Sequence, residues 1–474
     1  MCRGGVQKST SSSPERSSCH TSVMGRRPKQ PNHQLGELLY ETRASRKGFA
    51  RRIVERGRGI GIELRYDHTS VGRWLAGEQP TSPGPNLIAE VLTELCGRRI
   101  TPSDCGMAVD RSAKSGLEFS LTLAGATASV TELWSSDVER RRFLEGTAYA
   151  VAVYPAASMR WLTLPGREHP ASTTGLRRIG VSDIDALRTM TTAFRDLDNQ
   201  VGGGKVRSTV VHYLHTSVAP LLRASYTEEV GRRLFAVTAE LTKLAGWAAY
   251  DLEEHGLAQR YLIQALRMAR AAGDTALGAE ILAAMSHQAT YVGRPGDAVD
   301  LARAAQIAAR SAGLPALEAG CYMVEAHGHA ARSDARSCAN SLNAAEGAFD
   351  RDGSNRPPWL SYLDTAYMAA KAAQCFRDLG DNDRAAVLAR RSLNMSDGYQ
   401  RGKVFNLCLL ASSLVAADPQ EAVRIGTTAL ELAGTVESRR TYAYLRDVRA
   451  RLAPYCEIPA VEEFRRQVTS ARSE

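Results

Sequence analysis

Residues 45–80 read SRKGFARRIVERGRGIGIELRYDHTSVGRWLAGEQP, and this stretch decides the fold of the N-terminal quarter of the chain. Residues 45–54 have the composition of a first helix, and residues 69–77 that of a second. Apolar residues of the second segment recur with the spacing of one helix face, at Val71, Trp74 and Leu75. The sequence therefore predicts two short helices that pack together, with Trp74 in the core and a polar face left exposed on the second helix.

Most of the positive charge of the chain lies in and around this stretch. Between Arg43 and Arg73 there are nine Lys or Arg residues and three acidic residues, a net charge of +6, whereas the whole chain carries +9. Residues 1–115 hold 19 Lys or Arg and 11 Asp or Glu, which leaves about +1 for the other 359 residues. A concentrated positive surface attracts a polyanion and binds it in a salt-dependent way. We therefore expect nucleic-acid contact in this quarter of the chain and a different role for the remainder.

The second segment resembles the recognition helix of Xre-type (Cro/repressor-like) helix-turn-helix proteins. Residues 70–80 follow the pattern of these proteins, with Arg73 and Gly77 at the matching Arg and Gly positions. Gly77 is suited to end the helix in a left-handed conformation, and Ala50 matches the small residue that lets the first helix approach the second. The resemblance covers roughly residues 35–95. It implies a domain that binds double-stranded DNA and places its second helix in the major groove.

The resemblance also implies which residues contact DNA. The candidates are Arg51, Arg52, Arg65, Thr69, Ser70 and Arg73. Ser70 and Arg73 would face base edges, and the others would lie at the entry to the groove or on phosphates. The chain departs from the family in residues 55–68, which are longer than the usual turn of about four residues. This segment could form a basic wing on the DNA backbone. The alternative is a small helical domain whose arginines are only solvated.

A repeated pattern of small and aliphatic residues runs through residues 235–455. Small or aliphatic residues recur at relative positions 0, +4 and +7, which is one face of a helix that needs close contact with a partner. The sets are Ala258, Leu262 and Ala265; Ala298, Ala302 and Ala305; Cys338, Leu342 and Ala345; Ala385, Ala389 and Ser392; and Ala422, Gly426 and Ala429. Gly293 and Gly380 precede two of these sets, where tight turns are expected. The region resembles five tetratricopeptide-repeat helical hairpins.

These patterns predict an all-α fold, with an N-terminal helix-turn-helix domain followed by a TPR-like α-solenoid. The expected order is a disordered arm rich in basic residues and serine at 1–31, the helix-turn-helix domain at 32–110, a helical linker at 111–234, the five hairpins at 235–455 and a tail at 456–474. Within the linker, residues 182–199 and 206–223 read as two helices that pack on the first repeat.

A solenoid of hairpins has a concave face on which a partner can bind. Polar residues at roughly equivalent positions of the first helices are the effector-binding candidates: Tyr250, His287, Gln288, His327, Tyr367 and Asn406. The expected ligand is a signalling peptide, a small effector or a protein partner. The repeats are also expected to form a homodimer, because one short recognition helix reads too few bases for a specific site.

Enzyme and cofactor signatures are weak. Gly202-Gly203-Gly204-Lys205 resembles a phosphate loop, but Asn199 and Val206 stand where that loop needs Gly and Ser or Thr. We therefore expect no enzyme activity, no metal and no cofactor. Residues 140–144 resemble the core of a twin-arginine export signal, but they lie deep in the chain and are expected to be an internal buried helix. Nine scattered cysteines without a CxxC pair favour reduced thiols in the cytoplasm. The apolar run at 147–157 contains Tyr149, Tyr154 and Pro155 and cannot span a bilayer, so no membrane contact is expected.

The order of these two regions resembles a family of bacterial transcriptional regulators, some of which bind a short signalling peptide through their repeats. A subset in filamentous bacteria controls antibiotic production and sporulation. The resemblance implies a cytoplasmic, sequence-specific DNA-binding regulator. The alternative is a TPR protein-interaction scaffold that does not bind DNA, and an exported protein is a third reading.

Overall fold

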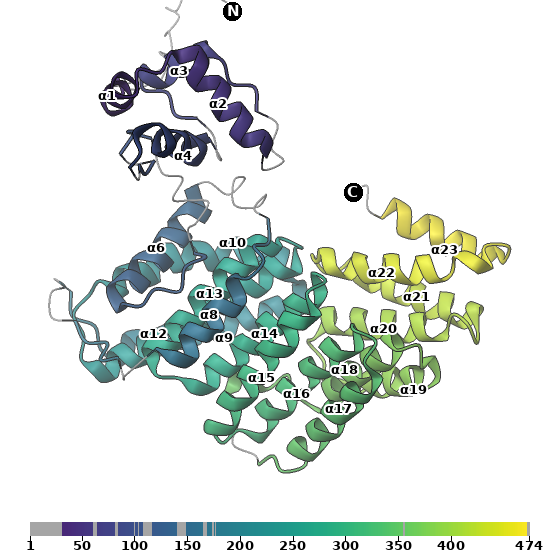
Figure 1. Cartoon of the computed structure of the whole chain (residues 1–474). Helices are drawn as coiled ribbons and strands as arrows, with labels where there is room; N and C mark the ends of the chain where they lie inside the picture. Colours follow the sequence, from purple (N-terminus) through teal and green to yellow (C-terminus); the bar gives the residue numbers. More distant parts are fainter. Residues whose placement is uncertain are drawn as a thin grey trace, which may run out of the picture. The chain divides into compact units, whose positions relative to one another are not determined.

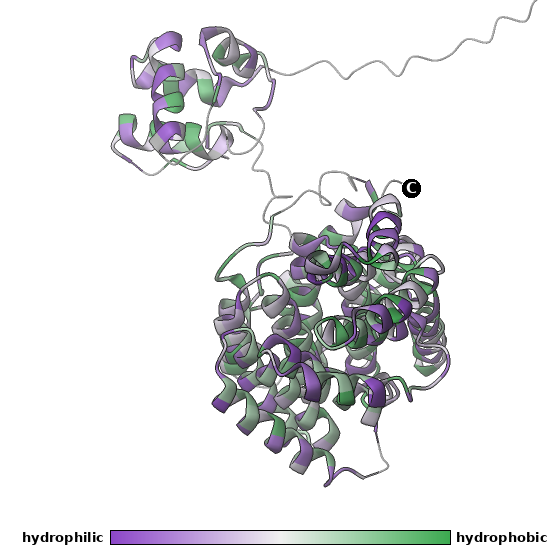
Figure 2. Cartoon of the chain, turned by 90° about the vertical axis from the view of Figure 1, so that its right-hand side faces the viewer, coloured by the Kyte–Doolittle hydropathy of each residue, from purple (hydrophilic) through white to green (hydrophobic). Residues whose placement is uncertain are grey.

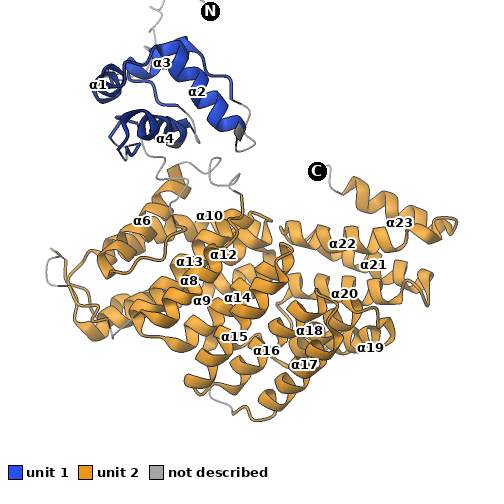
Figure 3. Ribbon diagram, viewed as in Figure 1, with its two compact units in different colours: residues 1–111 blue, residues 112–474 orange. Residues whose placement is uncertain are grey.

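The apolar runs of the sequence form helices throughout the part of the chain that the computed structural model describes, which is residues 31–59, 64–80, 84–98, 100–102, 104–107, 116–139, 148–164, 168–172, 175, 177–353 and 356–471. Within these residues the only β-type pairings are two isolated bridges, between Ser172 and Tyr226 and between Arg178 and Ser225. The predicted all-α class is therefore confirmed. The chain divides into two units, residues 1–111 and residues 112–474 (Figure 3).

The described residues of the first unit form the helices α1 (His33–Glu41), α2 (Arg46–Gly59), α3 (His68–Leu75) and α4 (Gly84–Cys96) (Figure 1). Its core includes Phe49 and Ile53 of α2 together with Trp74 of α3, which is only 3% exposed. The Trp74 ring meets the edge of the Tyr66 ring at 4.9 Å between centroids. The prediction that Trp74 is a core residue is confirmed.

The second helix of the pair begins and ends close to the predicted positions. Gly77 has a φ of +91°, and its N–H donates to the Trp74 carbonyl, while the N–H of Glu78 donates to the Arg73 carbonyl. This pair of bonds is the Schellman arrangement, which a left-handed glycine permits. The first helix is longer than predicted, since α2 continues to Gly59. The segment between the helices is therefore shorter than the predicted 55–68, and its residues 60–63 lie outside the described part of the chain.

The second unit begins with helices that the sequence assigned to a linker. They are α6 (Leu123–Glu139), α8 (Val153–Thr163), α9 (Val181–Val201), α10 (Gly203–Tyr213), a π-helix (Leu214–Val218) and α11 (Ala219–Leu222). These helices share one core with the first hairpins and are not a linker. Trp161 of α8, for example, lies against Gly278, where an added Cβ would stand 2.3 Å from the indole ring. The predicted packing of the 182–199 and 206–223 segments on the first repeat is confirmed.

Five helical hairpins follow, and Figure 1 shows them in order from teal to yellow. They are α12 (Glu228–Asp251) with α13 (His255–Ala272), α14 (Thr275–Tyr291) with α15 (Pro295–Ser311), α16 (Pro315–Ala330) with α17 (Ala335–Phe349), α18 (Thr365–Asp378) with α19 (Asn382–Ser392), and α20 (Gln400–Leu414) with α21 (Pro419–Ala433). The first hairpin thus begins at Glu228, earlier than predicted. Figure 2 shows hydrophobic and hydrophilic residues interleaved along these helices, as helices with one apolar face require.

The repeated small residues lie where the sequence predicted them. Every member of the five sets is on the second helix of its hairpin and is buried. Small side chains let the two helices of a hairpin approach closely, which is why the pattern recurs. Gly293 and Gly380, with φ of +76° and +85°, form the turns inside two hairpins. Consecutive helices pack against one another as a solenoid requires, and the repeated small residues lie on the packing face.

The C-terminal residues form further helices, α22 (Arg439–Arg451) and α23 (Pro459–Ser470). Residues 456–474 are therefore not a tail, which corrects the sequence prediction. Phe464 of α23 is 1% exposed and lies over Gly426, where an added Cβ would stand 2.9 Å from its ring. The sequence analysis did not assign a packing partner to the apolar residues of α23. A terminal helix with one buried face covers the end of a hairpin array and so stabilises it.

The two ends of the hairpin array are joined. The N–H of Glu437, just before α22, donates to the Val201 carbonyl at 2.8 Å, and the Gly204 N–H donates to the Glu437 carbonyl at 3.0 Å. An added Cβ on Gly203 would stand 2.8 Å from backbone atoms of Ala248. The glycine run that fails as a phosphate loop thus permits close contact between α10, α12 and the start of α22. Among the described residues, no helix is long and apolar enough to cross a bilayer.

Candidate functional site

The exposed surface of α3 is organised by its N-terminal cap. The Asp67 carboxylate accepts hydrogen bonds from the Ser70 N–H at 2.9 Å, the Ser70 hydroxyl at 3.0 Å and the Thr69 hydroxyl at 2.7 Å. These bonds hold the pKa of Asp67 well below its usual range, because all three stabilise the ionised form. The cap fixes the first turn of α3, which is the turn that the resemblance places in the major groove.

The six DNA-contact candidates differ in their exposure to solvent. Five are exposed, namely Arg51, Arg52, Arg65, Thr69 and Arg73. Ser70 is only 3% exposed, and its hydroxyl belongs to the cap. The prediction that Ser70 faces base edges is therefore wrong, since its side chain points toward the protein. The signal for this role was present in the sequence as Asp67 three residues before Ser70, the spacing of a capping box.

Two of the exposed arginines have only weak partners on the protein. Arg73 Nε lies 3.5 Å from Glu78 Oε2, and Arg51 Nε lies 3.7 Å from Glu55 Oε1. Exposed ion pairs of this length contribute little to stability, so a phosphate or a base edge can replace them at small cost. Arg56 differs, because it reaches Glu90 at 3.6 Å and Glu94 at 3.2 Å on α4. It therefore holds α2 against α4, which argues against a DNA-contacting wing through Arg56.

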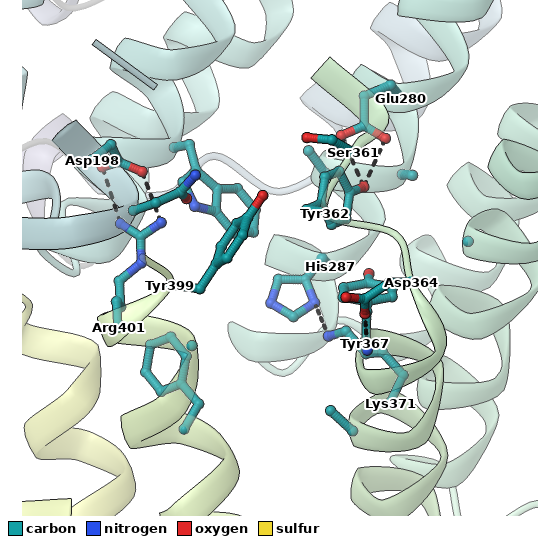
Figure 4. A pocket seen from close by; sticks show the side chains of 18 of the residues that line it. Asp198, Glu280, His287, Ser361, Tyr362, Asp364, Tyr367, Lys371, Tyr399 and Arg401 are labelled. Carbon is teal, nitrogen blue, oxygen red and sulfur yellow. Dashed lines mark hydrogen bonds and ion pairs between the residues drawn. The ribbon is translucent and has the colours of Figure 1, made fainter. Parts of the chain in front are cut away.

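The second unit contains a cavity of about 300 Å³ on the inner face of the hairpin array. Its walls come from α9, from the first helices of all five hairpins and from α22, with two loops completing it. Figure 4 shows Asp198, Arg401 and Tyr399 on one side of this cavity, and His287, Tyr367 and Lys371 on the other. The lining is rich in aromatic rings, including Trp247, Trp359, Tyr362, Phe405 and Tyr444. A cavity of this size fits a small organic molecule.

The structure also divides the six effector candidates. Three of them line the cavity, namely His287, Tyr367 and Asn406. Asn406 is partly committed, because its amide donates to the Ser392 carbonyl at 2.9 Å. The six candidate positions were expected to lie on one face of the first helices, but the cavity contacts only three of them.

The other three candidates contact neighbouring side chains of the protein and do not line the cavity. Tyr250 is fully buried among aromatic rings. Gln288 bonds to Tyr154 of α8 and to the His255 carbonyl. His327 Nε2 lies 3.4 Å from Asp378 Oδ2. Their assignment to the ligand site is wrong, because α8 and neighbouring hairpins cover the positions at which they point.

One wall of the cavity carries a lysine and a histidine in contact. Lys371 Nζ lies 2.9 Å from His287 Nδ1. Burial lowers the pKa of Lys371 to about 7, and repulsion from Arg440 adds to this effect. Burial and the same cations hold the pKa of His287 well below its usual range, so this imidazole is neutral and can accept a hydrogen bond from the ammonium group.

Arg440 of α22 lies beside this pair in an aromatic cage. Its guanidinium carbon is 4.1 Å from the centroid of the Tyr250 ring and 4.7 Å from that of Phe405. The side chain is 3% exposed, and its Nε and Nη1 atoms have no hydrogen-bond partner among the described residues. The nearest carboxylate oxygen is Asp251 Oδ1, 3.8 Å from Nη1. Buried guanidinium groups are normally hydrogen-bonded, so this one lacks the acceptor that its position calls for.

The other lining cations are paired with carboxylates. Arg195 donates to Glu240 at 2.7 Å, and Lys243 pairs with Glu280, which also accepts from the Tyr362 hydroxyl at 3.0 Å. Arg401 donates two hydrogen bonds to Asp198 and a third to Asp251. The remaining lining carboxylate, that of Asp364, caps α18. These pairs leave Arg440 and Lys371 as the lining cations that have no carboxylate within hydrogen-bond distance among the described residues.

Sequence reasoning missed most of the cavity. Trp359, Ser361 and Tyr362 belong to the loop that lengthens the spacing between the third and fourth hairpins. An insertion that breaks a regular repeat is a signal for a functional loop, and it could have been used. Arg440 and Lys371 had no such signal, because their surroundings are assembled from distant helices.

Residues 35–108 match a family described as the SP15 N-terminal domain. The match lies within the first unit and covers less than half of the chain. No curated protein matches the sequence.

Proposed function

We propose that the protein is a sequence-specific DNA-binding transcriptional regulator. The observation that carries this proposal is the exposed basic surface of α2 and α3 in the first unit. Arg51, Arg52, Arg65, Thr69 and Arg73 are all exposed there, and a net charge of +6 is concentrated between Arg43 and Arg73. The length and cap of α3 suit the recognition helix of a helix-turn-helix pair, whose first turn contacts base edges. Ser70 is excluded from that contact.

We further propose that the hairpin array is the sensor of this regulator. The cavity favours a small effector, because about 300 Å³ is within the size range of small-molecule sites. A homodimer remains part of the proposal, since a single α3 reads few bases. An effector can change DNA affinity only if it binds one state of the protein more tightly than another.

Fluorescence anisotropy with a labelled random-sequence duplex tests DNA binding directly. The full chain should bind at low salt and lose affinity steeply as salt rises. The double substitution Arg51→Ala and Arg52→Ala should weaken this binding and reduce the salt slope by about two. Arg98→Ala is the matched control, because Arg98 is an exposed arginine two residues after the end of α4 and pairs with Glu41 at 2.9 Å.

The alternative is a protein-interaction scaffold built on the same hairpins. A chain that shows no binding to duplex at low salt would favour the scaffold and contradict the regulator. Binding that falls equally in the Arg98→Ala control would show that α2 and α3 are not the contact surface.

A further inference from the structure

Arg440 lies in the cavity wall with part of its guanidinium group unpaired. Its guanidinium lines the cavity, is buried in an aromatic cage and has two nitrogen atoms without hydrogen-bond acceptors. Asp251 does not supply the missing acceptor, because its Oδ1 lies 3.8 Å from Arg440 Nη1, beyond hydrogen-bond distance. The two oxygens of Asp251 accept instead from the Ser438 hydroxyl, the Gly203 N–H and Arg401. A carboxylate presents two oxygens in the plane of a guanidinium fork and can bind two of its N–H groups at once.

Lys371 supplies a second point of attachment on the same wall. Its ammonium group contacts neutral His287, and its lowered pKa reflects burial and the charge of Arg440. An anion placed between the two cations would offset both effects. The other lining cations already have carboxylate partners, so Arg440 and Lys371 are the two lining cations with which a carboxylate of the ligand could pair.

The rest of the lining specifies the body of the ligand. Trp247, Phe405 and Tyr444 surround the Arg440 side of the cavity, while Leu277 and Val324 add aliphatic surface. Aromatic side chains of this kind stack on a flat apolar group. We propose that the cavity binds a small organic acid that has one carboxylate on a flat apolar or aromatic body, with the carboxylate held by Arg440 and Lys371. Its role as the effector rests on the proposed function, but its binding does not.

Isothermal titration calorimetry on the full chain, without DNA, tests this site. The probes are 2-naphthoate and its neutral analogue 2-naphthamide, which differ in charge and hardly in shape. The naphthoate should bind at least about tenfold more tightly than the amide. Arg440→Met and Lys371→Met should each weaken naphthoate binding by about tenfold or more and should leave the weak amide binding unchanged.

Two matched variants control for nonspecific charge effects. Arg439→Met changes the exposed neighbour of Arg440 on α22, and Lys403→Met changes an exposed lysine on α20. Both should bind naphthoate as the unaltered chain does. Unfolding of each variant is followed by circular dichroism. The comparison of acid with amide in the unaltered chain needs no variant, so it holds even if one variant unfolds.

Two results would overturn the proposal: equal affinity for acid and amide, or no heat of binding for naphthoate at millimolar concentration. Naphthoate that binds through Arg440 and Lys371 but leaves duplex affinity unchanged would support the acid site and contradict its role as sensor. If the chain binds duplex DNA but does not bind naphthoate, the proposed DNA-binding function stands and the proposed acid site is contradicted.

Discussion

Arg401 on α20 donates hydrogen bonds of 3.0 and 2.7 Å to the two carboxylate oxygens of Asp198 on α9, a residue 203 positions earlier in the chain. Both side chains are buried, and Arg401 also reaches Asp251 at 3.3 Å. This pair joins the fifth hairpin to α9, one of the helices that come before the first hairpin in the chain. It makes the hairpin array a closed structure around its cavity, where the repeat pattern alone predicts an open groove.

Removal of Arg401 should therefore destabilise the second unit strongly. Arg401→Met leaves two buried carboxylates without their cation, and the expected loss is about 3–5 kcal/mol in the free energy of unfolding. Asp198→Asn in the same chain should recover part of this loss. Arg424→Met is the control, because its pair with Glu421 is on the exposed face of α21, and it should leave the stability almost unchanged. Chemical denaturation measures all three, and equal effects of Arg401→Met and Arg424→Met would contradict the closure.

The glycines beside this junction give a second test. Gly203→Ala would place a Cβ 2.8 Å from the backbone of Ala248, so α10 and α12 would have to separate. We expect a loss of about 1–3 kcal/mol in the free energy of unfolding. Gly296→Ala on α15 is the matched control, since an added Cβ there meets nothing within 4 Å, and it should be neutral or slightly stabilising. A neutral Gly203→Ala in a thermal melt would show that the contact is not close.

Burial of Lys371 should make stability depend on pH. Its pKa is lowered from 10.5 to about 7, so between these values the unfolded chain binds more protons than the folded one. The cost of burying this lysine is therefore fully present below pH 7 and falls as the pH rises. His287 and Arg440 face Lys371 from α14 and α22, Tyr367 lies on its own helix, and Cys375 and Asp378 raise its pKa in part.

Lys371→Met removes this cost and should stabilise the protein at pH 7 and below. Its advantage over the unaltered chain should shrink by roughly 2 kcal/mol between pH 7 and pH 9. Melting curves at several pH values measure the difference. Lys403→Met, at an exposed site on α20, should show no such trend. A constant advantage of Lys371→Met across this range would mean that Lys371 keeps an ordinary pKa.

Substitution of Trp74 should destabilise the first unit strongly and leave the stability of the second unit unchanged. Trp74→Ala removes the largest side chain of a small core and should cost roughly 3–5 kcal/mol. Hydrogen exchange in the full chain should then show rapid exchange across α1 to α4 and unchanged protection in the hairpins. Tyr40→Ala is the control, because Tyr40 is an aromatic residue on α1 that is 88% exposed. Unchanged protection of α1 to α4 in Trp74→Ala would contradict the assigned core.

The sequence predicted those parts of the molecule that depend on local patterns. The small residues at 0, +4 and +7 located the second helix of every hairpin, because close helix packing constrains exactly those positions in each repeat. Gly77 located the end of α3 for a similar local reason. The Asp67 cap was equally local, and overlooking it led to the wrong role for Ser70.

The cavity could not be predicted in this way. The environment of Arg440 comes from helices that are far apart in the sequence, because aromatic rings of α12, α14 and α20 surround its guanidinium group. Among the described residues, its Nε and Nη1 atoms also have no hydrogen-bond acceptor. No spacing rule connects these positions. Tyr250, Gln288 and His327 shared a helix position with residues that line the cavity, but contacts from α8 and neighbouring hairpins decided which of them reach it.

Selection of duplexes from a random pool by the full chain, followed by sequencing, tests whether α3 reads base sequence. We expect the unaltered protein to enrich a defined sequence, and Arg73→Ala to lose preference at one or two base pairs while it keeps its affinity for random duplex. Arg51→Ala should weaken binding to all sequences alike. If the unaltered chain enriches no sequence, or if Arg73→Ala enriches the same sequence equally well, the assignment of α3 as a base-reading helix is contradicted.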